Sequence, residues 1–503
     1  MSSSPPRARP DAPRDAPPGV QRVVVVGADA AGMSAAHQAL RTARARGHGI
    51  ALTVFERTSH TSYSACGIPY WVAGDVNGGD RLVARTAAQH RAAGIDLRLG
   101  VEVIGLDPGA RTVTAHDLRT GERSTHAYDD VVLATGAAPR VPPWAVAEDG
   151  GPVGGVRAVK DLDDGAAWLA MLGDVTDRRS PSGVALGPDG RPVRGVVVGG
   201  GYIGLEMAEA FARRGLATTL VTRHEVMGSL DPDLGARVRA ALEKAGVTVR
   251  VGVDVDALST GADGRVACVS AGDERFEGHL VALGLGVRPR TGLAAAAGLP
   301  LGAHGGLLPD DRQRVADGVW AAGDCCEHLE RHGGLRVYVP LGTHANKEGR
   351  VAGENLAAGR PADAMVRFGG VLGTAITRFA ANGVHLEIAR TGPTTEQARA
   401  TGREVASLVT ESTTASGYMP EAAPIAVKVL ADPATRRLLG VQIVGGPGAG
   451  KRIDTAAAAL WLGADLDDVA GMDLSYAPPF SPVWDPVQIA CRRLADRLGR
   501  PGS

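Results

Sequence analysis

The sequence predicts an α/β fold with two doubly wound, Rossmann-like domains and a third, α+β domain at the C-terminal end. Two observations support this prediction. A short apolar strand opens directly into a glycine-rich turn and a helical pattern at two places, after Val23–Val26 and after Gly195–Val198. Beyond about residue 365 no such turn occurs, and strand-like runs at 404–409, 425–430 and 438–444 precede helical runs at 454–462 and 487–498.

The first strand–turn–helix unit has the features of a dinucleotide-binding loop. Gly27 permits a tight turn, and Gly32 permits close packing of the helix, expected over about residues 33–45, on the strand. The N-terminus of that helix attracts a pyrophosphate. Glu56, at the end of the next strand, is placed to accept ribose hydroxyls. Asp29 stands where the pattern has its middle glycine, so its carboxylate must point away from the phosphates.

The second unit carries the complete glycine pattern, with Gly199, Gly201 and Gly204. Where an acidic residue would bind the ribose of NADH, the sequence has Thr222 followed by Arg223. An arginine can pair with a 2′-phosphate, whereas an acid would repel it, so this position favours NADPH over NADH. A solvated arginine with relaxed specificity is the other interpretation.

Two other apolar strands end in turns that suit a flavoprotein with two nucleotides. One breaks at Thr135-Gly136, and the other ends in Gly323-Asp324. In a flavoprotein the Asp324 side chain could hold the ribityl chain. Four such pieces in this order indicate one FAD and one nicotinamide coenzyme.

Cysteine usage indicates one redox-active thiol. The five cysteines are too few and scattered for a disulfide framework and lack zinc spacing; they are Cys66, Cys268, Cys325, Cys326 and Cys491. We expect the last four to be buried small residues, since strain disfavours a disulfide between adjacent cysteines. Cys66 has no second cysteine near it in the sequence. At a flavin, it would have to use a sulfur from a second molecule, or an oxygen as sulfenic acid.

The bulk composition gives no sign of several other classes. A formal net charge of −1 does not indicate nucleic acid or an anionic membrane as a partner. The first twenty residues lack an apolar signal-peptide core and are predicted to be a disordered tail. No apolar run approaches membrane-spanning length, so a cytoplasmic location is expected, and no metal site is expected. Gly445–Arg452 nearly matches a Walker A loop but lacks its Ser/Thr, so we expect a turn there.

On these residues and two further motifs, the chain resembles the pyridine nucleotide-disulfide oxidoreductase superfamily over about residues 22–494. The motifs are Ser-x-x-x-Cys-Gly-x-Pro-Tyr around Cys66, and Leu474–Ser481 followed by Trp-Asp-Pro at 484–486. Both motifs resemble the single-cysteine branch, which contains coenzyme A-disulfide reductases, NADH oxidases and NADH peroxidases. Among these groups, the chain resembles the coenzyme A-disulfide reductases most. The glutathione reductase-like branch carries two cysteines five residues apart, and this chain does not.

The resemblance implies FAD on the first unit, NADPH or NADH on the second, and a homodimer whose active sites are shared between subunits. The implied domains are a tail (1–20), an FAD domain (21–158 and 284–362), an NAD(P)H domain (159–283, with an insertion of no assigned role at 172–194) and a dimerisation domain (363–496). The implied FAD-binding residues are Gly27, Ala31, Gly32, Glu56, Arg57, Val103, Thr135, Gly136, Gly323, Asp324 and Ala345. The implied NAD(P)H-binding residues are Gly199, Gly201, Ile203, Gly204, Glu206, Arg223 and Gly286.

The resemblance to coenzyme A-disulfide reductases also implies an activity, the reduction of coenzyme A disulfide or a related low-molecular-weight disulfide. Hydride would pass from NADPH to FAD, and the electron pair to Cys66, which rests bonded to a small thiol. Tyr418 or Tyr476 of the other subunit would protonate the leaving thiolate. Arg41, in the first helix, would pair with the phosphates of coenzyme A.

Three alternatives stay open. An NAD(P)H oxidase or peroxidase would cycle Cys66 through sulfenic acid, but similar oxidases carry a histidine where this chain has Ala30. A persulfide or polysulfide reductase uses the same single-cysteine chemistry, although no rhodanese module is expected after Trp484. A non-catalytic redox-sensing flavoprotein would have no need of the pair Tyr418 and Tyr476.

Overall fold

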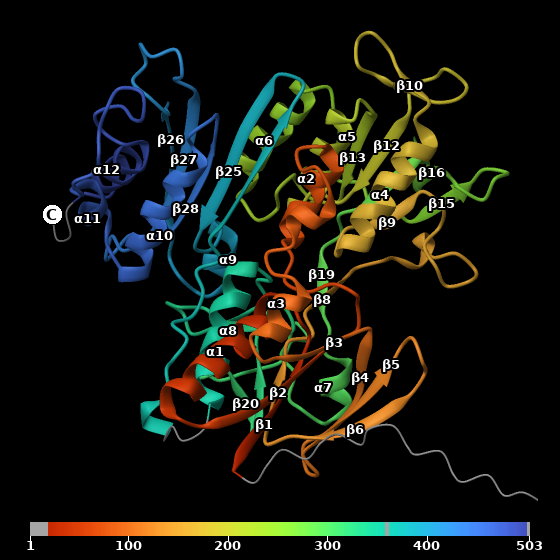
Figure 1. Ribbon diagram of the computed structural model, residues 1–503. Helices are drawn as coiled ribbons and strands as arrows, with labels where there is room; N and C mark the ends of the chain where they lie inside the picture. Colours follow the sequence, from red (N-terminus) through yellow and green to blue (C-terminus); the bar gives the residue numbers. More distant parts are fainter. Residues whose placement is uncertain (1–18, 358–361, 500–503) are drawn as a thin grey trace, which may run out of the picture. The chain divides into compact units, whose positions relative to one another are not determined.

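The computed structural model describes residues 19–357 and 362–499, so the predicted tail lies outside the described part except at its last two residues. The described chain divides into two compact units (Figure 1). Unit 1 contains the residues up to Tyr63 together with Val83–Ala137 and Pro289–Gly370. Unit 2 contains Ser64–Leu82, Ala138–Arg288 and the residues from Val371 onward.

Unit 1 is built on a six-stranded sheet that is parallel except at one edge, where β20 pairs antiparallel with β21. The strands, in sheet order, are β20 (Arg314–Ala316), β21 (Val319–Ala321), β7 (Asp130–Leu133), β1 (Val20–Val26), β2 (Gly49–Glu56) and β3 (Asp96–Leu99). The run Val23–Val26 is buried throughout, because β1 lies inside the sheet between β2 and β7. A parallel strand covered on both faces is continuously apolar, which explains this run.

Two helices of unit 1 approach each other at backbone distance. They are α1 (Ala30–Arg46) and α8 (Gly342–Leu356). A Cβ atom on Gly349 would lie 2.1 Å from the carbonyl oxygen of Ala31, so only glycine permits this contact. The other elements are a three-stranded antiparallel sheet of β4 (Val101–Asp107), β5 (Thr112–Asp117) and β6 (Arg123–Ala127), with α3 (Ala87–Ala92), α7 (Gly292–Ala296), β22 (His328–Leu329) and β23 (Arg336–Val337).

Unit 2 repeats the strand–turn–helix plan in a five-stranded parallel sheet. Its strands, in sheet order, are β14 (Thr248–Val251), β13 (Ala217–Thr222), β12 (Arg194–Val198), β18 (Leu280–Leu283) and β9 (Val156–Ala158). The accompanying elements are α4 (Leu162–Val175), α5 (Tyr202–Arg213), α6 (Pro232–Lys244) and the antiparallel strands β15 (Ala257–Thr260), β16 (Val266–Ala271) and β17 (Glu274–Glu277). The short helix α2 (Ile68–Ala73) also belongs to this unit and packs against α5.

Part of the segment predicted as an insertion, 172–194, lies in regular elements of the domain. Residues 172–175 complete α4, and Arg194 already begins β12. Between them, β10 (Arg178–Arg179) pairs antiparallel with β11 (Ala185–Leu186). The Pro-Asp-Gly turn at 188–190 is closed by a backbone hydrogen bond of 2.9 Å.

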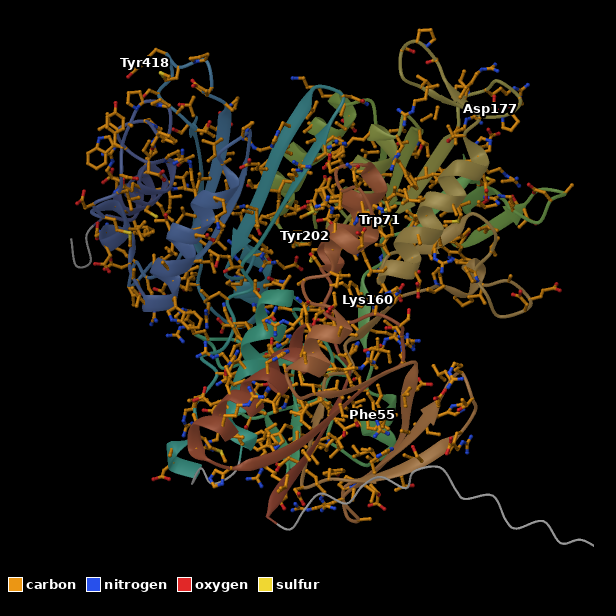
Figure 2. The ribbon with its side chains drawn as sticks, in the orientation of Figure 1. Phe55, Trp71, Lys160, Asp177, Tyr202 and Tyr418 are labelled. Atoms are coloured by element: carbon orange, nitrogen blue, oxygen red, sulfur yellow. The ribbon has the colours of Figure 1, made fainter. Side chains whose placement is uncertain are left out.

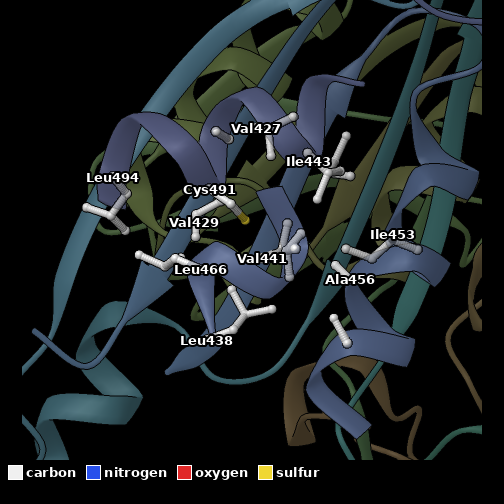
Figure 3. Close-up of a cluster of buried hydrophobic side chains, with 14 of the residues drawn as sticks. Val427, Val429, Leu438, Val441, Ile443, Ile453, Ala456, Leu466, Cys491 and Leu494 are labelled. Carbon is white, nitrogen blue, oxygen red and sulfur yellow. The ribbon is translucent and has the colours of Figure 1, made fainter. Parts of the chain in front are cut away.

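The C-terminal part of unit 2 is an antiparallel sheet covered by helices (Figure 3). Its strands, in sheet order, are β24 (Ala375–Ala381), β25 (Val384–Thr391), β28 (Leu438–Gly445), β27 (Pro424–Ala431) and β26 (Ala406–Thr413). The helices are α9 (Thr395–Ala400), α10 (Ile453–Leu462), α11 (Leu466–Ala470) and α12 (Pro486–Leu498). Figure 3 shows Val427, Val441 and Cys491 in the core between the strands and these helices. The sequence predicts β26 to β28, α10 and α12, and misses β24 and β25.

Two expectations outside the sheets can be compared with the structure. Within residues 19–357 and 362–499, no helix combines the length and the apolar character needed to cross a membrane. The near-Walker segment forms the end of β28 and a turn that includes the 3-10 helix Gly450–Arg452. The N–H of Gly450 is bound by the carboxylate of Glu387 at 2.7 Å, so this turn is fixed by protein contacts.

Candidate functional site

The first glycine turn of unit 1 is so tightly packed that it requires its glycines. Gly27 has a left-handed φ of 106°, and a Cβ atom there would lie 2.2 Å from the carbonyl oxygen of Ala134. A Cβ atom on Gly32 would lie 1.9 Å from the carbonyl oxygen of Gly27. Helix α1 therefore begins directly at the turn, where its first N–H groups can receive a phosphate.

Small side chains surround this turn. The buried cluster and its packed neighbours are Ala30, Ala31, Ala134, Ala322 and Ala345. A Cβ atom on Gly323 would lie 2.8 Å from the Cβ atom of Ala31, so the ends of β7 and β21 and the helices α1 and α8 meet here without bulky groups. These close backbone approaches fit the pyrophosphate and ribityl parts of FAD.

The end of β2 braces the same turn. One carboxylate oxygen of Glu56 accepts the N–H of Ala28 at 2.9 Å, and the other accepts the N–H and the hydroxyl of Thr58, each at 2.9 Å. The first of these oxygens keeps a further lone pair for a ribose hydroxyl, whereas both lone pairs of the second are taken by Thr58. Arg57 beside it is exposed, and Val103 on β4 is buried.

The turn at Thr135-Gly136 is fixed by two hydrogen bonds to one residue. The Thr135 hydroxyl donates to the carbonyl oxygen of Arg290 at 2.5 Å, and the N–H of Arg290 donates to the carbonyl oxygen of Gly136 at 2.9 Å. Gly136 has a left-handed φ of 67°, which favours glycine at this position.

A buried ion pair that sequence reasoning missed holds the Gly323-Asp324 turn. The N–H of Gly323 donates to one carboxylate oxygen of Glu348 at 2.8 Å, and Nδ1 of His328 lies 2.6 Å from the other. Both side chains are buried. Burial opposes a charge on His328, but the hydrogen bond and the charge of Glu348 raise its pKa overall. The carboxylate of Glu348 thus binds the turn through one oxygen and the imidazole through the other.

The second glycine turn, in unit 2, reproduces the geometry of the first. Gly199 also has a φ of 106°, and a Cβ atom there would lie 2.4 Å from the carbonyl oxygen of Gly284. A Cβ atom on Gly204 would lie 1.9 Å from the carbonyl oxygen of Gly199. At Gly201, in contrast, no atom of the described residues lies within 4 Å of an added Cβ. The turn therefore leaves room at Gly201, which fits a pyrophosphate.

Helix α5 carries the next predicted residues, Ile203 and Glu206. Burial raises the pKa of Glu206 to about 7, while the hydroxyl of Thr377, which donates to it at 3.0 Å, lowers it and the charge of Glu209 raises it. Glu206 is therefore partly protonated near neutral pH. Gly286 follows β18 with a left-handed φ of 79°.

Cys66 is the exposed cysteine of the five. It lies in the 3-10 turn Ala65–Gly67, directly before α2, in unit 2. The other four are buried, as predicted, and Sγ of Cys325 and Sγ of Cys326 are 3.9 Å apart. Burial raises the pKa of Cys491 to about 12. Thiol chemistry with an external compound is therefore available only at Cys66.

Ser62, the first residue of the cysteine motif, is part of a histidine chain in unit 1. Its Oγ lies 2.9 Å from Nε2 of His90, and Nδ1 of His90 lies 2.8 Å from Nε2 of His37. Arg85 also donates to Nε2 of His37 at 2.9 Å. Because Nε2 of His37 then accepts, Nδ1 of His90 donates to it, and Nε2 of His90 accepts a hydrogen bond from the Ser62 hydroxyl. This histidine chain orients the hydroxyl of Ser62. The backbone of Ser62 has an unusual φ of 47°.

This histidine chain predicts a loss of stability in mild acid. Burial, followed by the charges of His37 and Arg85, lowers the pKa of His90 from 6.5 to about 4. The unfolded chain binds the proton more readily, so the free energy of unfolding falls as the pH drops from 6.5 towards 4. Urea unfolding at several pH values should show that the free energy of unfolding falls less steeply with decreasing pH in His90→Gln than in the wild type. The control His48→Gln, at an exposed site, should leave this pH dependence unchanged. Parallel wild-type and His90→Gln profiles would contradict the assignment.

The two predicted tyrosines lie on exposed loops of the C-terminal part of unit 2. The side chain of Tyr418 is 75% exposed and that of Tyr476 is 46% exposed. Figure 2 shows Tyr418 on a loop that projects from the end of the sheet. The N–H of Ser416 donates to the carbonyl oxygen of Pro478 at 2.9 Å, which joins the two loops.

Arg452 holds both tyrosine loops through hydrogen bonds to their backbone, a role that the sequence does not reveal. Its guanidinium donates to the carbonyl oxygen of Thr414 in one loop and to that of Phe480 in the other, and it pairs with the carboxylate of Asp485. Its side chain is only 12% exposed. Phe480 and Trp484 beside it are strongly exposed, which is typical of a surface that a second subunit covers.

Family models match nearly the whole chain. The model described as pyridine nucleotide-disulphide oxidoreductase matches residues 21–349. The model of the dimerisation domain of the same oxidoreductases matches residues 383–486. The second match covers most of the antiparallel sheet and the exposed tyrosine loops.

Curated relatives cover the same range. The chain is 35% identical over 478 residues to the NAD(P)H coenzyme A polysulfide/persulfide reductase of Pyrococcus horikoshii, with 94% of this chain and 98% of the relative covered. It is 29% identical to an NADH oxidase of Methanocaldococcus jannaschii, with 95% and 99% covered. It is 26% identical to the coenzyme A disulfide reductase of Staphylococcus haemolyticus, with 92% and 96% covered.

Solved structures of similar proteins also cover most of the chain. The reduced CoADR-RHD of Bacillus anthracis is 26% identical with a TM-score of 0.85, and 95% of this chain and 81% of that chain are covered. An NAD-dependent persulfide reductase from A. fulgidus is 30% identical with a TM-score of 0.83, with 95% and 84% covered.

Two glycine turns of the same geometry, one exposed cysteine and a matched dimerisation domain thus agree with one family. The chain belongs to the pyridine nucleotide-disulphide oxidoreductases, in the single-cysteine group of coenzyme A-disulfide reductases, NADH oxidases and persulfide reductases, and is an FAD- and NAD(P)H-dependent disulfide oxidoreductase.

Proposed function

We propose that the chain is an NAD(P)H-dependent reductase of persulfide or polysulfide sulfur linked to coenzyme A. The single observation behind this proposal is the exposed Cys66, with the other four cysteines buried. Such a thiol exchanges with a sulfur–sulfur bond brought by another molecule. Three relatives of 34–35% identity, named for coenzyme A-dependent sulfur or persulfide reduction, support coenzyme A-linked sulfur as that bond. The relative named for coenzyme A disulfide is 26% identical.

The chemistry at Cys66 balances in two steps. The Cys66 thiolate attacks coenzyme A persulfide, forms a mixed disulfide with coenzyme A and releases hydrosulfide. Two electrons and one proton then restore the thiolate and release coenzyme A as the free thiol. When bound, FAD supplies the means of passing the electron pair of the NAD(P)H hydride onward. We propose that Tyr418 and Tyr476, from a second copy of the chain, donate hydrogen bonds or a proton to the departing sulfur.

The other predicted contacts belong to the same proposal. The residues of the first glycine turn and the turns at Thr135 and Gly323 would hold FAD, and those of the second turn would hold NAD(P)H. Arg41 is exposed on α1 and donates to Gln38 at 2.5 Å. It would contribute to holding the phosphates of coenzyme A.

An anaerobic assay of the purified, FAD-loaded enzyme tests the proposal. We expect NAD(P)H oxidation with coenzyme A persulfide, or with polysulfide plus catalytic coenzyme A, and one hydrosulfide released for each coenzyme A persulfide reduced. Polysulfide without coenzyme A should react at least about tenfold more slowly, because the thiol carrier is then missing.

Two outcomes would favour a different activity, one that other members of the group carry out. Faster turnover with coenzyme A disulfide than with the persulfide would favour the disulfide reductase, whose tyrosine positions the chain shares. Rapid oxygen consumption matched to NAD(P)H loss would favour the oxidase. Ala30, in place of the histidine expected for oxidases, argues against the second outcome.

A further inference from the structure

The coenzyme-selecting end of β13 lacks a usable acceptor of its own. Thr222 is buried beneath the glycine turn, where a Cβ atom on Gly200 would lie 3.0 Å from its hydroxyl oxygen. That hydroxyl donates to the carbonyl oxygen of His224 at 3.0 Å. The residue at this position therefore packs the turn and offers no carboxylate to a ribose.

An acidic residue reaches this end of β13 from the loop that follows the neighbouring strand, β14. The N–H of Val253 donates to the carbonyl oxygen of Thr222 at 3.1 Å, so the loop after β14 lies against the end of β13. The next residue in that loop is Asp254. One of its carboxylate oxygens lies 3.5 Å from a terminal nitrogen of Arg223.

The Arg223–Asp254 ion pair is exposed to solvent and can separate easily. Its side chains are 66% and 72% exposed, and ion pairs with that exposure are weak and screened by salt. Glu225, the other acid nearby, is already engaged by Arg239 at 3.2 Å and by the N–H of Val226. Asp254 is thus the carboxylate that competes for Arg223.

We propose that Asp254 sets the coenzyme preference of the enzyme. Its carboxylate accepts the ribose hydroxyls of NADH, and it both neutralises Arg223 and repels a 2′-phosphate. With NADPH, Arg223 leaves Asp254 and pairs with the phosphate. The chain therefore uses both coenzymes without the NADPH preference that Thr222 and Arg223 alone predict. This inference concerns the coenzyme and does not depend on which sulfur compound is reduced.

Two substitutions should move the preference in opposite directions. In Asp254→Asn, we expect the ratio of kcat/KM for NADPH to that for NADH to rise about tenfold or more, since Arg223 is released and the repulsion is lost. In Arg223→Gln, the same ratio should fall by about tenfold or more, because the partner of the phosphate is removed. Asp256→Asn removes a negative charge from the same loop, where the Asp256 carboxylate accepts the N–H of Gly272 at 3.1 Å, and should change the ratio less than about twofold.

A binding measurement separates this inference from turnover. Calorimetric titration of the FAD-loaded protein with 2′,5′-ADP and with ADP reports the 2′-phosphate contribution without any sulfur substrate. Asp254→Asn should tighten 2′,5′-ADP relative to ADP, and Arg223→Gln should weaken it. An unchanged or reversed ratio in Asp254→Asn, or an equal effect of Asp256→Asn, would overturn the assignment. A failure of the sulfur assay alone would leave these ratios intact.

Discussion

Cys66→Ser is expected to stop sulfur reduction while leaving the reduction of FAD by NAD(P)H unchanged. A serine hydroxyl is a far weaker nucleophile than a thiolate and cannot form a mixed disulfide, so the turnover number with a sulfur acceptor should fall by about a thousandfold or more. Stopped-flow absorbance would then show the flavin bleaching on addition of NAD(P)H and staying reduced when coenzyme A persulfide follows. In the wild type it should return to the oxidised spectrum.

A second cysteine supplies the control for this experiment. Cys268 is buried on β16 and donates to the carbonyl oxygen of Val269 at 3.3 Å, so Cys268→Ser keeps a donor there. We expect it to retain nearly full turnover with a modest loss of stability, about 1 kcal/mol. Sulfide release by Cys66→Ser at a rate close to that of the wild type would remove the cysteine from the mechanism altogether.

The parts of the fold that repeat a local pattern are predictable from the sequence. The two glycine turns each combine an apolar strand, fixed glycine spacing and a helix in one contiguous stretch, at 20–46 and at 194–213, and the structure shows both turns with the same close contacts. The exposed cysteine is equally predictable, because the residues of its motif are contiguous in the sequence. These features need no knowledge of what the distant chain contributes.

The missed hairpin of β24 and β25 shows where periodicity fails. In β24 the apolar Ile376 is 47% exposed, while its neighbour Thr377 is buried. Thr377 points inward because its hydroxyl donates to Glu206 on α5, and Arg378 on the opposite face pairs with Asp75. At 376 and 377 the polarity is therefore the reverse of what burial requires, although Phe379 further along the strand is buried. The reversal becomes intelligible only when the partners are known.

The unpredicted site residues share the same cause. Glu348, Arg452 and Asp254 act on Gly323, Thr414 and Arg223, which lie 25, 38 and 31 residues away in the chain. Sequence spacing gives no signal for such pairs, since a carboxylate or guanidinium in isolation is most often a solvated surface group. Only the acid missing at Thr222 hints that another strand must supply one.

Two alanine substitutions in the second glycine turn should separate folding from coenzyme binding. In Gly204→Ala, the new Cβ atom would lie 1.9 Å from a backbone oxygen and 2.9 Å from the carbonyl carbon of Gly199. Neither atom can move without displacing α5 from β12, so we expect a loss of about 3 kcal/mol or more in the free energy of unfolding. Urea unfolding, or loss of soluble protein at 37 °C, should reveal it.

Gly201→Ala should leave the fold intact and still impair the enzyme. Gly201 has an extended backbone with φ of −81°, which any residue adopts, and no atom of the described residues lies within 4 Å of the added Cβ. Its unfolding free energy should stay within about 0.5 kcal/mol of the wild type. FAD content should also be unchanged, because the first turn is untouched. The control Gly173→Ala, at an open position in α4, should gain about 0.5–1 kcal/mol in unfolding free energy because alanine is the better helix former, and should leave coenzyme binding unchanged.

The space at Gly201 is then empty for the protein but not for the coenzyme. If the pyrophosphate of NAD(P)H passes over this glycine, the alanine methyl group displaces it, and the dissociation constant for NAD(P)H should rise about tenfold or more. Dithionite, which needs no binding site, should still reduce the flavin of Gly201→Ala at the rate seen for the wild type. Normal NAD(P)H binding in Gly201→Ala, together with unfolding in Gly204→Ala, would mean that the turn shapes α5 but that the coenzyme phosphates bind elsewhere.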